Sequence, residues 1–237
     1  MDAALMNIGL GLVTSLLGAL LGGLWERGRR RRTVHRQASV FGVRPGEPCT
    51  IVLGSKHDAP LTAHRRDATA GIELAAFLAG LGCPVVVKDG SLRGGNGDRT
   101  EFCIGGPVGG ANPRTGGHLA AHLPGVAIRP FEAAEDGVAI DVGGRLYRFD
   151  RGVQEYVLVA RFTPAESSRP VVLFCGQSSV GNQAAIAFLR REYAQVMAAV
   201  PSVNRFCVLI RIGHIGTYLF HQAALEQDVS EAAFARH

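Results

Sequence analysis

The chain has 237 residues, of which 47% are apolar and 19% charged, and its formal net charge is +5. The apolar share excludes a disordered chain, and 31 glycines without a Gly-X-Y period exclude a fibrous one. A mean hydropathy of +0.15 is unusual for a soluble enzyme, so it indicates a membrane segment. The length suits one domain with an appendage.

The first apolar segment has the length and flanks of a membrane anchor. Residues Ala3 to Leu24 carry no charge, and a helix of this length covers about 33 Å, enough to cross the bilayer core. Trp25 follows where an interfacial aromatic residue belongs. A cleaved signal peptide would need basic residues before the apolar stretch, but only Asp2 is charged there. We therefore expect a retained single-pass anchor over residues 1–25.

The positive charge is concentrated directly after this segment, in Arg27, Arg29, Arg30, Arg31, Arg32 and Arg36. From residue 37 onward, 19 basic residues face 18 acidic ones. A nucleic-acid-binding protein would spread its basic residues over a folded face, so no nucleic-acid partner is expected. Arginines beside an apolar helix instead bind anionic lipids and orient the chain. We expect an inner-membrane protein with its N-terminus outside, a basic linker over residues 26–48 and a cytoplasmic domain over 49–237.

Small residues recur every four positions in the apolar segment, at Gly11, Ser15, Ala19 and Gly23. Such a strip lets helices approach closely, which predicts a homo-oligomer. The alternative is that glycine and alanine are simply common in membrane helices, and the sequence leaves both open.

Residues 49–237 alternate between strand and helix patterns. This predicts an α/β fold class, with a Rossmann-like layered domain and a mixed sheet. The expected strands are Cys49–Leu53, Pro84–Val87, Phe102–Ile104, Val126–Phe131, Tyr156–Phe162, Val171–Cys175, Phe206–Ile212 and Thr217–Phe220, the last two as an antiparallel pair. The expected helices are Arg66–Leu81, Asn112–Leu123 and Val180–Val200. A hairpin is expected around Gly143-Gly144, between Val138–Val142 and Arg145–Phe149.

No metal site is expected from the cysteines and histidines. The five cysteines are scattered without a CxxC pair, which predicts small core residues in a reducing compartment. His118 and His122 lie four apart on a helix but lack the glutamate of an HExxH motif, so a surface pair is favoured. The glycine-rich stretch Asp89–Thr100 predicts either a functional lid or a disordered loop.

Three glycine-rich loops each follow a predicted strand and precede a helix. Ligands of open α/β sheets bind beyond the carboxyl ends of the strands, and glycine loops with helix N-termini offer N–H groups to anions. A nucleotide-like anionic ligand is therefore expected, although ordinary tight turns would have the same composition. The expected ligand-binding residues are Gly54, Ser55, Lys56, Gly105, Gly106, Asn112, Gly176, Ser178, Ser179, Gly181 and Asn182.

The third loop lacks the reactive groups of two known hydrolytic motifs. Gly176 and Gly181 have phosphate-loop spacing, but Asn182-Gln183 replaces the lysine and hydroxyl residue of that motif. The GxSxG nucleophile pattern is also absent. Asp58, Glu73 and Glu101 are the candidate catalytic carboxylates. No cofactor is expected.

Four features of the sequence together resemble a group of bacterial membrane-anchored proteins. They are the leading helix, the strand ending in Gly54-Ser55, the segment Ile104-Gly105-Gly106-Pro107 with Asn112, and the segment Gly181-Asn182-Gln183-Ala184-Ala185. The globular parts of that group are similar to Rossmann-like nucleotide-sensing domains, SLOG-type and TIR-like, of antiphage and nucleotide-signalling systems. The Pro-Gly-Gly-x-Gly-Thr pattern of the SLOG type is absent here.

The leading hypothesis is a membrane-anchored sensor or effector whose cytoplasmic domain binds a nucleotide-like ligand. The first alternative is a membrane-tethered nucleotide-hydrolysing enzyme, similar to an NAD glycohydrolase, that works through a carboxylate. The second is a structural scaffold.

Overall fold

The computed structural model describes residues 2–56 and 59–235, without the side chains of 2–17, 30, 31, 56, 59–61 and 134. The chain divides into two compact units, Met1–Arg36 and Gln37–His237. Helix α1, Asp2–Phe41, forms the first unit and continues into the second.

The first unit is helical throughout its described part. Arg27, Arg29, Arg32 and Arg36 are exposed along α1. Among the residues that the structure describes, no helix is both long and apolar enough to cross a membrane. The side chains of residues 3–17, including that of Ser15 in the small-residue strip, lie outside the described part, and so does the surface around Gly11.

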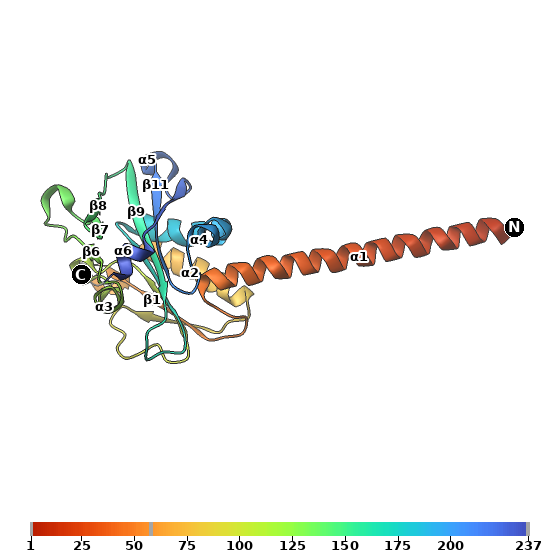
Figure 1. Ribbon diagram of the computed structural model, residues 1–237, viewed down its shortest axis with the longest axis horizontal. Helices are drawn as coiled ribbons and strands as arrows, with labels where there is room; N and C mark the ends of the chain where they lie inside the picture. The colour runs from red at the N-terminus through yellow and green to blue at the C-terminus, as the bar shows by residue number, and fades with distance from the viewer. Residues whose placement is uncertain (1, 57–58, 236–237) are drawn as a thin grey trace. The chain divides into compact units, whose positions relative to one another are not determined.

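The second unit is built on a seven-stranded mixed sheet (Figure 1). Its strands are β1 Cys49–Leu53, β4 Val85–Asp89, β5 Thr100–Ile104, β9 Gln154–Phe162, β10 Val171–Gly176, β11 Phe206–Gly213 and β12 Ala223–Asp228. They are ordered β12-β11-β9-β10-β5-β1-β4. Neighbours from β4 to β10 are parallel, whereas β9 is antiparallel to β10 and β11, and β12 is antiparallel to β11. The predicted α/β class with a mixed sheet is confirmed.

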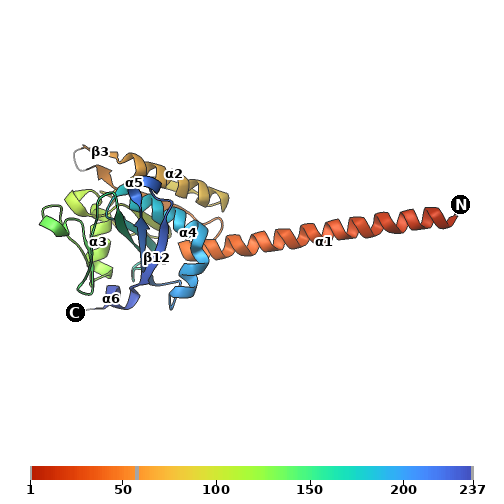
Figure 2. The same cartoon turned by 90° about the horizontal axis from the view of Figure 1, so that it is seen from above.

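Helices cover both faces of this sheet (Figures 1 and 2). Helices α2, Arg65–Gly80, and α4, Ser179–Ala199, pack on one face. Helices α3, Pro113–His122, and α6, Ser230–Phe234, lie on the other. Successive side chains of a strand point to opposite faces of the sheet. Because helices bury both faces, the central strands carry apolar side chains on both. In β5, for example, Phe102 contributes to the α2 side and Cys103 packs in the cluster with Leu119 of α3. All five cysteines are buried, as predicted.

A second sheet of three strands covers the α3 side. It consists of β6 Val126–Ile128, β7 Ile140–Val142 and β8 Arg145–Tyr147. Gly143 and Gly144, with φ of +59° and +85°, form the turn between β7 and β8, which confirms the predicted hairpin. The remaining short elements are β2 Ser55–Lys56, β3 Ala59–Ala63, α5 Ile215–Tyr218 and 3-10 turns at Val108–Gly110 and Ala134–Asp136.

The prediction of a strand at Thr217–Phe220 is wrong. His214 and Leu219 adopt positive φ values and enclose the single helical turn α5, Ile215–Tyr218. The chain then reverses, and β12 pairs antiparallel with β11 instead. The reversal places the closing strand several residues later than the apolar pattern indicated.

The compact unit begins earlier than the expected domain boundary at residue 49. Phe41 is fully buried, with ring centroids 4.8 Å from Phe77, 6.3 Å from Phe102 and 6.4 Å from Phe174. The end of α1 is therefore part of the core and not of a linker, because its aromatic side chain joins α2 to two central strands.

Polar contacts fix the same end of α1. The Gln37 amide donates to the Arg190 carbonyl oxygen of α4 at 2.8 Å. The buried Arg161 guanidinium donates to the carbonyl oxygens of Ser39 and Val203, and burial lowers the pKa of Arg161 to about 10. These bonds tie the last turn of α1 to β9 and to the loop after α4.

Replacing Phe41 by alanine should destabilise the protein by about 3–5 kcal/mol, because it opens a cavity among three aromatic rings. Urea unfolding of the full-length chain in detergent measures the change. The matched control is Trp25→Ala, since Trp25 is 77% exposed. Equal stability of the two variants would contradict the placement of Phe41 in the core.

Candidate functional site

The three glycine-rich loops predicted to meet do line one cavity, of about 700 Å³. They follow β1, β5 and β10, which are adjacent and parallel, so their carboxyl ends lie at one edge of the sheet. The cavity therefore occupies the position at which open α/β sheets bind ligands.

Most of the expected ligand-binding residues line this cavity, namely Gly54, Ser55, Gly105, Gly106, Gly176, Ser178, Ser179 and Asn182. Asn112 and Gly181 are not among the residues that line it. The side chain of Lys56 and the whole of Asp58 lie outside the described residues.

The two asparagines have structural roles that account for their polar atoms. Asn112 is fully buried; its Oδ1 accepts from the Thr115 N–H at the start of α3, and its Nδ2 donates to the Ile104 carbonyl oxygen. Asn182 accepts from the Gly176 N–H at 2.7 Å and donates to Asp67 at 2.8 Å. Each amide therefore joins the end of a strand to a helix and shapes a loop.

Close packing of the loops explains why glycine occupies several of their positions. A Cβ atom on Gly176 would lie 2.7 Å from the Ser178 carbonyl oxygen, and Gly105 has a φ of +107° that favours glycine. At Gly106 a Cβ would lie 3.3 Å from the Cys175 sulfur. Within the described part of the chain, no hydrogen bond occupies the Gly106 N–H, so this N–H is available to a ligand.

Two buried carboxyl groups also line the cavity. Asp67, in the first turn of α2, accepts from Asn182, and burial raises its pKa. Glu155 lies near the start of β9 and is only 1% exposed. Burial raises the pKa of Glu155 to about 6, although the nearby Ser178 hydroxyl, Gly181 N–H and Arg66 charge favour its ionised form.

Sequence reasoning missed Glu155, although a signal was present. Because β9 is antiparallel to β10, Val157 pairs with Gly176, and Glu155 extends beyond it to the edge where the loops converge. Glu155, Val157 and Val159 share one face of β9 by their spacing of two. A carboxylate on the same strand face as buried valines predicts a functional group. Its position at the cavity depends on the direction of β9, which the sequence does not show.

The opposite wall of the cavity is apolar. Its residues come mainly from the segment around the small sheet and include Ile128, Phe131, Val138 and Phe149. Apolar and aromatic lining with a few polar groups is typical of small-molecule sites.

Glu73 and Glu101, two of the candidate catalytic carboxylates, do not line this cavity. Glu73 accepts from Gln183 of α4 at 3.0 Å. Glu101 is fully buried on the α3 side, where it accepts two hydrogen bonds of 2.7 Å from Arg114. The expectation that these carboxylates serve the loops is therefore not supported by their positions.

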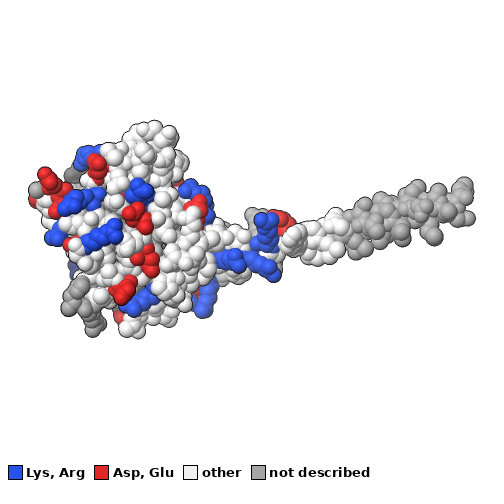
Figure 3. Space-filling model, turned by 45° about the horizontal axis from the view of Figure 1, so that its top comes forward, with Lys and Arg blue, Asp and Glu red and all other residues white. Residues whose placement is uncertain are grey.

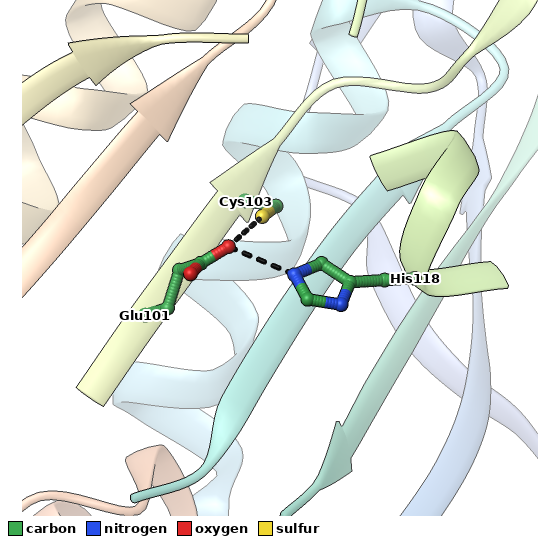
Figure 4. Close-up of side chains that lie close together, drawn as sticks. All are labelled: Glu101, Cys103 and His118. Atoms are coloured by element: carbon green, nitrogen blue, oxygen red, sulfur yellow. Dashed lines mark hydrogen bonds and ion pairs between the residues drawn. The ribbon is translucent and has the colours of Figure 1, made fainter. Parts of the chain in front are cut away.

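Glu101 also lies 2.8 Å from His118 Nε2 and accepts from Cys103 Sγ at 3.2 Å (Figure 4). These three side chains could together hold a metal ion. However, Arg114 already pairs with both carboxylate oxygens, and its positive charge disfavours a cation. The arrangement is better explained as a buried ion pair, which holds the pKa of Glu101 down at about 2 despite burial.

The histidine prediction is wrong in one respect. His118 is buried and bound to Glu101, and His122 packs against Phe162 with ring centroids 4.7 Å apart. His118 therefore faces the sheet, whereas His122 is half-buried. The spacing of four residues reflects helical packing on β9.

The stretch Asp89–Thr100, expected to be either a functional lid or a disordered loop, does not border the cavity. Gly94 accepts from Arg114, Gly97 accepts from Ser167, and Asn96 donates to Arg169. The loop is thus held against α3 and the segment before β10. It lines a different hollow of about 490 Å³.

Glu155→Gln should stabilise the unliganded protein at pH 8 by about 2 kcal/mol, because the folded-state pKa of about 6 lies above the ordinary 4.5. The folded state binds this proton more tightly, so wild-type stability falls as pH rises from about 4.5 through 6. The difference between variant and wild type should vanish near pH 4. Urea unfolding of both proteins measures it, with Glu132→Gln, an exposed change, as control. A Glu155→Gln protein less stable than wild type at pH 8 would contradict the assignment.

Comparisons with protein-family models, with curated proteins and with solved structures each find no match.

Proposed function

We propose that the α/β unit binds a nucleotide-like anionic ligand in the cavity at the ends of β1, β5 and β10. The convergence of three glycine-rich loops there carries this proposal. N–H groups such as that of Gly106 suit phosphate oxygens. The apolar wall with Phe131 and Phe149 suits a planar base.

In this proposal the protein is a membrane-anchored sensor or effector. The apolar segment 3–24 anchors it, and the arginines between residues 27 and 36 contact anionic lipids on the cytoplasmic side. The globular unit is nearly neutral, and Figure 3 shows its acidic and basic side chains interspersed on the visible face. That pattern supports a small-molecule ligand over a nucleic acid. In this proposal the anchors of several chains associate, so that ligand binding in one globular unit affects the whole oligomer.

A nucleotide-hydrolysing enzyme, similar to an NAD glycohydrolase, is the second candidate. One observation favours it: the buried Glu155 carboxyl in the cavity has a raised pKa, as many catalytic acids and bases do. Glu155, which lines the cavity, is therefore tested before Glu73 and Glu101, which do not.

Gly106→Val should abolish ligand-induced stabilisation, because the added side chain lies between the loops after β5 and β10. A ligand at 100 times its dissociation constant stabilises the wild type by about 2.7 kcal/mol. Thermal shifts of the full-length chain in detergent with ATP, NAD and ADP-ribose measure this. The matched control is Gly80→Val, at the far end of α2 in open space.

No shift with any of these nucleotides would contradict the proposed ligand class, and equal shifts in both variants would contradict the site. Chromatography of the same mixtures separates the two candidates. A sensor leaves NAD intact, whereas an enzyme releases nicotinamide and loses this activity in Glu155→Gln.

Protease added to intact spheroplasts should leave residues 40–237 uncut, because the basic run follows the anchor and keeps the chain on the cytoplasmic side. Immunoblotting for a C-terminal tag measures protection, and lysed cells provide the control. Complete digestion in intact spheroplasts would contradict this topology.

A further inference from the structure

Glu155 presents a carboxylate oxygen that its neighbours leave unpaired. The residue lines the cavity and is 1% exposed, and its Oε1 has no hydrogen-bond partner among the residues that the structure describes. A buried acceptor without a partner lowers the stability of the fold. Groups that break this rule concentrate at functional sites, where a ligand completes the missing bonds.

The surroundings of Glu155 leave room for its carboxylate and partly offset the cost that burial imposes on its charge. A Cβ on Gly181 would lie 3.3 Å from Oε1, so glycine at this position leaves the oxygen space. The N-terminus of α4 and the Arg66 charge both stabilise the ionised form. At neutral pH the group is therefore a charged acceptor that requires donors.

The residues that line the cavity limit which hydrogen-bond donors can face Glu155. A phosphate beside Glu155 would be repelled, because Asp67 adds a second carboxyl group to the same lining. A metal ion would need several ligands, and within the described residues the cluster suited to one is Glu101, Cys103 and His118, which excludes Glu155. Hydroxyl or N–H groups of the ligand remain.

We infer that Glu155 is a specificity-determining residue that accepts hydrogen bonds from the sugar hydroxyls of a ribonucleoside phosphate. This inference rests on the proposed function and names its ligand class. A vicinal diol offers two O–H donors to one carboxylate, as in other nucleotide sites. The glycine loops then bind the phosphate and the wall with Phe131 and Phe149 contacts the base, so each part of the cavity has one ligand group.

The test compares ribonucleotides with their deoxy forms. Calorimetry on the full-length chain in detergent measures the dissociation constants of the four ribonucleoside 5′-monophosphates and their 2′-deoxy counterparts. Loss of a hydrogen bond to a charged acceptor weakens binding about tenfold or more. The wild type should therefore prefer at least one ribonucleotide by that factor. Glu155→Gln should reduce the preference to under about threefold, while Glu73→Gln, outside the cavity, should keep it.

If Glu155→Gln fails to fold, Glu155→Asp replaces it: the shorter side chain withdraws the carboxylate and should likewise reduce the preference for the ribonucleotide. Equal affinity for ribo and deoxy forms would overturn the role of Glu155 and leave the proposed nucleotide site intact. Binding of none of the eight nucleotides would overturn this inference, whereas the proposed nucleotide site is decided separately by the thermal shifts with ATP, NAD and ADP-ribose. A preference that persists in Glu155→Gln would assign sugar recognition to another residue and overturn the inference.

Discussion

The parallel register of β1, β5 and β10 is the constraint on which the site depends. Leu53 pairs with Ile104, and Ile104 pairs with Phe174, so three loops far apart in the sequence start at one edge of the sheet. The antiparallel strand β9 then brings its first residues, with Glu155, to the same edge. A sheet with β9 reversed would keep the glycine loops together and would remove the carboxylate from them.

The polar groups at this edge divide into two kinds. Asn112 and Asn182 have both donor and acceptor engaged within the protein, so they hold the loops in place. The Gly106 N–H and the Glu155 Oε1 have no such partner in the described part of the chain. Since buried polar groups in folded proteins are normally paired, the unpaired Glu155 Oε1 supports the proposed contact with a ligand.

The central strands and the helices α2, α3 and α4 could be predicted from the sequence, because apolar runs and glycine turns are local signals, whereas the closing strand β12 could not. The convergence of the glycine loops could also be predicted, since the carboxyl ends of parallel strands lie at one edge of the sheet. Glu155 and the buried end of α1 could not be predicted in this way. The first depends on the direction of β9 and the second on Phe41 meeting Phe77, Phe102 and Phe174, and both are long-range relations. The roles of Asn112 and Asn182 likewise depend on contacts between elements.

If three loops and the start of β9 form one ligand site, as proposed, a bound ligand protects all four segments at once. Hydrogen-exchange mass spectrometry of the full-length chain, with and without ATP, NAD or ADP-ribose, measures this protection. We expect one of these ligands to slow exchange in segments 53–56, 104–112, 154–157 and 176–182 together, while exchange in segment 91–99 remains unchanged. Slowed exchange confined to segment 91–99, or to a single loop, would contradict it.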